Sequence, residues 1–271
     1  MKICSLSSGS NGNSVLVRSE CTNILIDAGI SGKKIDERLA GLSLTGSDLD
    51  ALLVTHEHID HIKSVGVLAR KCGVRIFATG GTVSELLHGK NSIGRVDPGL
   101  LNIIEYDRPF MVGDILVTPF KITHDAAEPA AYTFECKGDK IGFATDLGYV
   151  SDYVKQHLLG AKVLYIESNH DVQMLEAGSY PYQLKERIKS NLGHLSNDAC
   201  AKFIVDICSS QEIHINDVIL AHLSEENNFP DLAYETAMAE MKMHLEESRR
   251  PRIHVAPRYD LSYIASTESI K

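Results

Sequence analysis

Short apolar segments alternate along the chain with polar turns that carry histidine, aspartate or glycine. Strands are predicted where the apolar runs are short, at 2–6, 15–18, 23–29, 51–54, 74–78, 115–120, 140–144, 163–167, 217–224 and 253–256. Helices are predicted where apolar residues recur at helical spacing, at 31–42, 62–72, 82–88, 198–208 and 231–247. Between 101 and 117 the pattern predicts strands separated by turns. The chain is therefore expected to mix strands with helices.

One turn between a predicted strand and a predicted helix holds three histidines and two acidic residues, in the sequence HEHIDH. In an extended segment His56 and His58 point the same way, so they can bind one metal ion. Asp60 and His61, where the helix begins, can turn toward a second ion. Imidazole and carboxylate groups together suit zinc, iron or manganese. A surface loop with Asp60 as a helix cap is the simpler alternative, but the spacing after a buried strand favours a metal site.

The HEHIDH sequence after an apolar strand resembles the metal-binding motif of the metallo-β-lactamase superfamily. This resemblance implies an αββα sandwich, with two mixed sheets face to face and helices outside, as a single domain over 1–271. It also implies later ligands in the order His, Asp, His. His124 and Asp146, each just past a predicted strand, match the first two. Asp146 would bridge two ions, since its two oxygens can each bind one.

Two histidines are candidates for the last ligand. The order GHLSN, helix, strand and AHLS resembles ribonuclease Z and related nucleases. In those enzymes the later histidine binds metal, and the earlier one lies near the scissile phosphate and assists proton transfer. The resemblance thus assigns His222 to metal binding and His194, together with Asp60, to catalysis. The reverse assignment of the two histidines stays open.

Other polar residues are expected around the metals. Asp27, in an Asp-x-Gly sequence, matches the first motif of the superfamily, where it supports a ligand by hydrogen bonds; a carboxylate that caps a turn is the alternative. The glycine-rich loop 7–14 resembles the N-terminal signature of the WalJ/YycJ-type branch, and its hydroxyl and N–H groups could meet a phosphate. The expected substrate contacts are Ser8, Asn11, Asn13, Asn169, His170, Ser196 and Asn197, although His170 could instead cap the following helix.

Composition limits the setting of this site. The 271 residues carry a formal net charge of −9, which argues against a broad basic face for nucleic acid but allows a local groove. No apolar run approaches the about 20 residues of a membrane span, and the N-terminus turns polar too soon for a signal peptide. The six scattered cysteines fit a reduced, cytoplasmic chain better than a disulfide framework.

Taken together, loop 7–14, HEHIDH, SNHD and GHLSN resemble a WalJ/YycJ-type hydrolase, a branch associated with 5′-to-3′ exonuclease activity on double-stranded DNA. Two divalent ions, zinc or manganese with iron as a third option, would share a hydroxide as the nucleophile. The alternative is a small-molecule phosphodiesterase or lactonase. A redox di-iron protein is disfavoured because such proteins typically have glutamate where His58 stands, and a noncatalytic module would have lost ligands. Either a monomer or a homodimer fits the sequence.

Overall fold

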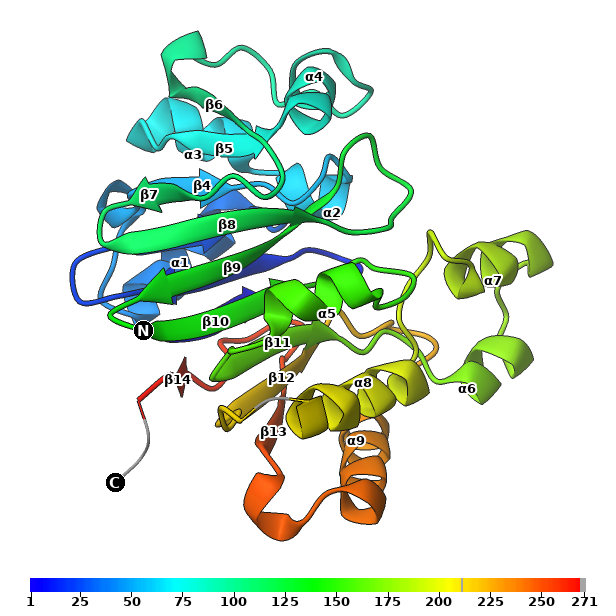
Figure 1. The fold of residues 1–271 in the computed structure, drawn as a ribbon. Helices are drawn as coiled ribbons and strands as arrows, with labels where there is room; N and C mark the ends of the chain where they lie inside the picture. The colour runs from blue at the N-terminus through cyan, green and yellow to red at the C-terminus, as the bar shows by residue number, and fades with distance from the viewer. Residues whose placement is uncertain (211, 269–271) are drawn as a thin grey trace.

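Within residues 1–210 and 212–268, which the computed structural model describes, two seven-stranded mixed sheets pack face to face (Figure 1). In spatial order, the first sheet contains β14 (Ala265–Ser266), β1 (Lys2–Ser7), β2 (Ser14–Arg18), β3 (Asn23–Ile26), β4 (Ala51–Leu53), β5 (Ile76–Thr79) and β6 (Leu101–Ile104). The second contains β13 (Arg252–Val255), β12 (Asp217–Ala221), β11 (Val163–Glu167), β10 (Asp139–Ala144), β9 (Ala130–Cys136), β8 (Ile115–Lys121) and β7 (Phe110–Val112).

Helices cover the outer faces of both sheets. The first sheet is covered by α1 (Gly32–Gly41), α3 (Val65–Cys72) and α4 (Gly80–His88), and α2 (Ile59–Ile62) precedes α3. The second is covered by α5 (Asp152–Leu158), α8 (Asn197–Ser210) and α9 (Pro230–His244), while α6 (Val172–Ala177) and α7 (Tyr182–Lys189) extend to the right in Figure 1. This arrangement confirms the expected αββα sandwich. In the described part of the chain no helix has the length and apolar character to cross a membrane.

The strands are apolar on both faces because both faces are buried. In β3, Ile24 and Ile26 pack in the core between the sheets, whereas Leu25 packs under the outer helices. A strand that is half exposed would alternate apolar with polar residues, but one that is covered twice reads as a continuous apolar run. This coverage of both faces explains why the strands appear in the sequence as short, continuous apolar runs.

Parallel pairing brings the predicted ligands to one edge. Strands β3 to β6 are parallel to one another, and so are β10 to β13. Strand β8 runs in the same direction as β10, since β9 is antiparallel to both. The segments after β8, β10 and β12 therefore leave the second sheet at the same end, and in such sheets that end is where ligands bind.

The prediction of a continuous helix over 62–72 is wrong. The structure has α2 and α3, separated at Lys63 and Ser64. The Ser64 N–H donates to the carbonyl of Ala28 at 2.8 Å, and its hydroxyl donates to the carbonyl of Ile30 at 2.6 Å. These bonds attach the turn to the segment after β3, and they hold the HEHIDH motif at a fixed distance from that strand.

Some elements were not predicted, and one helix is shorter than expected. Strand β9 is apolar but no ligand-bearing turn follows it, and it is defined by its pairing with β8 and β10. Helices α5 and α7 and the two-residue strand β14 were also absent from the prediction. Helix α9 ends at His244, before the expected limit of 247, because Leu245 is already extended.

Tyr132 connects the two sheets directly behind the HEHIDH motif. Its hydroxyl donates to the carbonyl of Val54 at 2.7 Å, and both residues are buried. We expect Tyr132→Phe to lower the free energy of unfolding by about 1 kcal/mol, since one carbonyl loses its partner. Urea unfolding measures this, with Tyr234→Phe on the exposed face of α9 as the control. Equal midpoints for Tyr132→Phe and the wild type would contradict the argument.

Candidate metal centre

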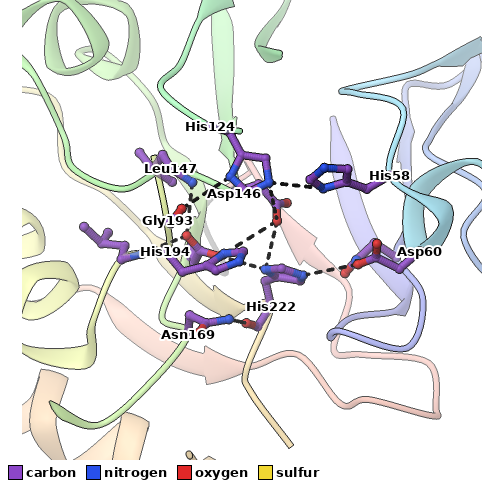
Figure 2. Close-up of polar contacts among 12 residues, drawn as sticks. His58, Asp60, His124, Asp146, Leu147, Asn169, Gly193, His194 and His222 are labelled. Carbon is purple, nitrogen blue, oxygen red and sulfur yellow. Dashed lines mark hydrogen bonds and ion pairs between the residues drawn. The ribbon is translucent and has the colours of Figure 1, made fainter. Parts of the chain in front are cut away.

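Three imidazoles from both halves of the chain form a first donor group, His56, His58 and His124. Their ligand nitrogen atoms lie within 4.8 Å of one another. The Nε2 atom of His124 is 3.3 Å from Nδ1 of His58 (Figure 2). Three imidazole nitrogens gathered this closely match three corners of a tetrahedral metal site.

Asp60, His61 and His222 form a second donor group, also with ligand atoms within 4.8 Å of one another. Oδ2 of Asp60 lies 3.4 Å from Nε2 of His61 and 3.8 Å from Nε2 of His222. Burial opposes ionisation of Asp60, but the charges and hydrogen bonds of His61 and His222 together outweigh it and lower the pKa of the carboxyl group. One carboxylate and two imidazoles again make a set that suits a divalent ion.

Asp146 lies between the two groups. Its Oδ2 is 3.5 Å from Nε2 of His61, and its Oδ1 is 3.2 Å from Nδ1 of His222 and 4.0 Å from Nε2 of His124 (Figure 2). The ligand atoms of His56, His61 and Asp146 also lie within 4.8 Å of one another. A single carboxylate therefore faces both groups, as a bridging ligand would.

Unpaired atoms in the centre test whether a cation fits. Among the described residues, His56 Nε2, Asp146 Oδ2 and His222 Nε2 are buried without a hydrogen-bond partner. A buried polar atom that lacks a partner costs about 1–3 kcal/mol. All three atoms belong to the two donor groups or to the carboxylate between them. The residues present therefore fit metal ions, which would satisfy these atoms.

Asp27 lies behind His61. One carboxylate oxygen is 2.7 Å from Nδ1 of His61 and accepts from the Thr55 hydroxyl at 2.8 Å, and the other accepts from the Thr55 N–H at 2.8 Å. This contact directs Nε2 of His61 toward Asp60 and Asp146. Burial opposes protonation of His61, but the carboxylates of Asp146, Asp60 and Asp27 raise its pKa well above the usual value.

Glu167, which was not predicted as a site residue, orients histidines of the second half of the chain as Asp27 orients His61. Its Oε1 lies 2.7 Å from Nδ1 of His222 and 2.9 Å from Nδ1 of His194. Its Oε2 accepts the N–H groups of Leu147 and Leu195 at 3.1 and 3.0 Å. Burial opposes ionisation, but these histidines and hydrogen bonds lower the pKa of Glu167. The sequence signal for this role was a glutamate at the end of a buried strand, at the sheet edge where the proposed metal ligands lie.

His194 and His222 differ in exposure although they share Glu167. The His222 side chain is 3% exposed and the His194 side chain 18%. Burial opposes protonation of His222, but Asp146 and its other acidic neighbours raise its pKa to about 10. Asp146, Glu167, His194 and His222 also form a set that could hold an ion. The buried His222 faces Asp60 with Nε2, whereas His194 lies nearer to solvent.

Three residues expected to contact substrate hold the candidate metal ligands in place. The Ser8 hydroxyl accepts from the His222 N–H at 2.8 Å, and the Asn169 amide donates to the His222 carbonyl at 2.8 Å. The Asn13 amide lies 3.3 Å from Oδ2 of Asp60. All three side chains are buried. Each of these residues therefore has a positioning contact, and its contact with substrate stays a prediction.

Two further expected contacts lie elsewhere. The Asn197 amide is buried and bonds to Ser168 and Asn228 at 2.7 and 3.0 Å, so it belongs to a buried polar network. The Asn11 amide is exposed and donates to the Glu225 carboxylate at 2.6 Å. Asn11 is accessible at the rim, whereas Asn197 is enclosed, and substrate contact by either residue stays a prediction.

His170 and Ser196 lie side by side, two residues on from Ser168 and from His194 in the chain. They form an isolated parallel bridge, and Ser196 is half-buried. Within the described residues, Nδ1 of His170 is buried without a partner, and burial lowers its pKa to about 4. The alternative that His170 caps the next helix is wrong, since the Asp171 side chain accepts from the Met174 N–H and caps α6.

Comparison with known proteins gives consistent matches. Residues 22–215 match a family model described as a β-lactamase superfamily domain. Exodeoxyribonuclease WalJ of Streptococcus pneumoniae is 41% identical over 87% of this chain and 86% of that protein. Exodeoxyribonuclease YycJ of Bacillus anthracis is 41% identical over 84% of each. The metallo-β-lactamase fold protein YhfI of Bacillus subtilis is 16% identical and superposes with a TM-score of 0.69, covering 98% of this chain and 99% of that one.

Proposed function

The chain belongs to the metallo-β-lactamase superfamily, and we propose that it is a metal-dependent exodeoxyribonuclease that cleaves duplex DNA from the 5′ end. The observation that carries the proposal is the pair of donor groups on either side of Asp146, whose carboxylate faces His124 of the first and His222 of the second. Relatives named as exodeoxyribonucleases match over more than four fifths of the chain at 41% identity, which supports a DNA substrate. The fold alone would not select a phosphodiester over an ester or a lactone.

We assign two divalent ions, zinc or manganese, to the centre. His56, His58 and His124 would hold one, Asp60, His61 and His222 the other, and Asp146 would contact both. When bound, such ions lower the pKa of a water molecule and neutralise charge that develops on a phosphate. Iron fits the same nitrogen and oxygen donors.

The side chains around the centre orient the ligands and move protons. Asp27 and Glu167 hold the Nδ1 atoms of His61 and His222, so that each ring offers Nε2 to an ion. Glu167 also holds Nδ1 of His194, the most accessible of these three rings. We assign to Nε2 of His194 the delivery of a proton to the leaving oxygen, and to Asp60 the orientation of the attacking water.

The cysteines support a reducing compartment, and we propose the cytoplasm. Cys4, Cys136, Cys200 and Cys208 are buried and free, and each has a raised pKa because of burial. Buried thiols with raised pKa values are unreactive and need no disulfide.

Degradation of labelled DNA by metal-loaded protein tests the proposed function. Linear duplex DNA labelled at the 5′ or the 3′ end, circular duplex DNA and bis(p-nitrophenyl) phosphate are assayed with zinc and with manganese. We expect early release of the 5′ label, progressive shortening of the linear duplex and an intact circle. Cleavage of the small diester with an intact linear duplex would contradict the proposal and favour a small-molecule phosphodiesterase.

Metal uptake is expected to release protons. His61 has a strongly raised pKa and His222 one of about 10, so both rings carry a proton at pH 7 in the metal-free protein. A ligand ring must lose that proton, so we expect about two protons released per chain and a metal affinity that rises with pH. Burial lowers the pKa of His56, which is already neutral. Titration calorimetry in buffers of different ionisation enthalpy measures the release, and zero release would contradict this assignment.

A further inference from the structure

Three cations surround Tyr259 beside loop 7–14. The ammonium nitrogen of Lys34 and the guanidinium carbon of Arg258 each lie 5.9 Å from the centre of the Tyr259 ring. The Arg38 guanidinium contacts the Tyr259 carbonyl and pairs with Asp260 at 3.4 Å. A cavity of about 80 Å³ is lined by Leu6, Ser7, Asn11, Ile30, Lys34, Arg38 and Tyr259. Positive charge is thus concentrated here on a chain whose formal charge is −9.

Arg258 packs against the segments that hold His222. A Cβ atom at Gly9 would lie 3.3 Å from Nε of Arg258, and Nη2 of Arg258 lies 3.4 Å from the Leu223 carbonyl. Gly9 follows Ser8, whose hydroxyl accepts from the His222 N–H. The guanidinium is therefore separated from a proposed metal ligand by one layer of backbone, and the absent side chain of Gly9 leaves it room.

The guanidinium of Arg258 is poorly satisfied within the protein. Its contacts to the Leu223 carbonyl and to Glu225 are long, at 3.4 and 3.8 Å, and its Nε is buried without a partner among the described residues. Glu225 is engaged by Asn11 at 2.6 Å and by the Tyr259 hydroxyl at 3.2 Å. An arginine has five N–H donors in a fork that suits an oxyanion. Donors that the protein leaves free at a partly exposed site fit a ligand.

Arg252 shows how a structural arginine in this chain differs. Its guanidinium makes two bonds of 2.8 Å to the buried carboxylate of Asp217, which uses both arms of the fork. Arg258 has no paired bonds of this kind, since its contact to the Glu225 carboxylate is 3.8 Å long. The Arg258 side chain is one quarter exposed, so a ligand can reach it.

We propose that Arg258, with Lys34 beside it, binds a backbone phosphate of DNA next to the scissile one. The inference rests on the proposed function and names a phosphate subsite that the metals do not supply. Lys34 adds a second positive charge near the Tyr259 ring, whereas Arg38 is already paired with Asp260. A phosphate there would receive the free N–H groups of Arg258 and would be neutralised in an otherwise acidic protein.

Variants Arg258→Gln and Lys34→Gln test the subsite in the metal-loaded full chain. The readouts are kcat/KM on linear duplex DNA relative to bis(p-nitrophenyl) phosphate, and the salt dependence of binding to a phosphorothioate-protected duplex. For Arg258→Gln we expect this ratio to fall about tenfold or more, because a charge-assisted contact is lost. The slope of log affinity against log salt should become shallower by about 0.9. Lys33→Gln, an exposed neighbour on α1 that pairs with Glu37, is the matched control and should change neither quantity.

Each outcome decides the inference. Arg258→Lys keeps the charge but not the fork, so it should restore the salt slope and only part of the lost ratio. Thermal unfolding checks that each variant is folded. If Arg258→Gln matches Lys33→Gln in both readouts while the wild type degrades the duplex, the phosphate subsite is overturned and the proposed function stands. If the wild type leaves the duplex intact and does not bind it, both proposals fail.

Discussion

Asp146→Ala should abolish DNA degradation and leave the protein with fewer than two bound ions. The carboxylate faces both donor groups, with distances of 4.0 Å to His124 in the first and 3.2 Å to His222 in the second, so its loss removes the link between them. Metal stabilisation of the reacting phosphate contributes several kcal/mol, so we expect kcat/KM to fall by about a thousandfold or more. Elemental analysis of the dialysed protein and the end-labelled duplex assay measure the two effects.

Two variants make this prediction specific. Asp146→Asn keeps the shape and one neutral oxygen, so it should bind more metal than Asp146→Ala but remain nearly inactive. Asp152→Ala, in the exposed first turn of α5, removes the same charge away from the centre and should match the wild type. Full metal content and activity in Asp146→Ala would exclude a shared carboxylate ligand.

Backbone conformation shows how tightly the centre is built. Asp27, Asp146 and His222 have φ values of 58°, 57° and 55°, in the left-handed region that non-glycine residues rarely occupy. Each such residue costs of order 1–3 kcal/mol and persists only where its surroundings impose it. All three follow a strand at the ligand edge, and their side chains turn back into the centre. Three of the six non-glycine residues with positive φ in the described part of the chain are therefore residues proposed to bind a metal or to orient a ligand.

Gly29 illustrates the same constraint on the first half. An added Cβ would lie 1.6 Å from the carbonyl oxygen of Asp60, so only glycine fits where the two turns touch. The Asn13 N–H donates to that same carbonyl at 2.8 Å. Loop 7–14, the turn after β3 and the HEHIDH motif are thus one hydrogen-bonded unit, which explains why they resemble a family signature together although they are distant in sequence.

The residues of the centre that could be predicted from their spacing are those that lie close together in the sequence. His56, His58, Asp60 and His61 lie within six residues after a buried strand, and their spacing is enough to place them together. His124, Asp146 and His222 are single residues in their segments, and they were assigned only through the order implied by the resemblance. The structure brings these three together because β8, β10 and β12 run in the same direction in the second sheet, and their side chains meet the HEHIDH motif of the first.

The parts that were missed depend on contacts between distant segments. Glu167 meets His194 and His222, which are 27 and 55 residues away, and no local pattern reports such a distance. Ser8 and Asn169 were expected to meet substrate because they are polar residues in turns. Their actual partners are backbone groups of His222, which lie 214 and 53 residues away from them. The polarity of these loop residues therefore predicted that they lie near the metal centre, but it did not predict which groups they contact.

His222→Ala and His194→Ala are expected to impair different properties, metal binding in the first variant and proton transfer in the second. His222 is buried, its backbone is held by Ser8 and Asn169, and its free Nε2 faces Asp60, so His222→Ala should lose one ion and about a thousandfold in kcat/KM. His194 is more exposed and its Nδ1 is held by Glu167. If it acts in proton transfer, His194→Ala should keep both ions and lose about 10²–10⁴-fold in kcat.

Leaving-group chemistry separates the two roles further. A nitrophenolate leaves without a proton, so His194→Ala should lose much less activity on bis(p-nitrophenyl) phosphate than on DNA, whereas His222→Ala should lose activity on both. Elemental analysis, the duplex assay and the diester assay on the same preparations complete the comparison. A loss of metal in His194→Ala with full occupancy in His222→Ala would reverse the assignment, and the set of Asp146, Glu167 and His194 would then be the place of the second ion.

Because Glu167 contacts both rings, Glu167→Gln should weaken metal binding and proton transfer together, which neither histidine variant does alone.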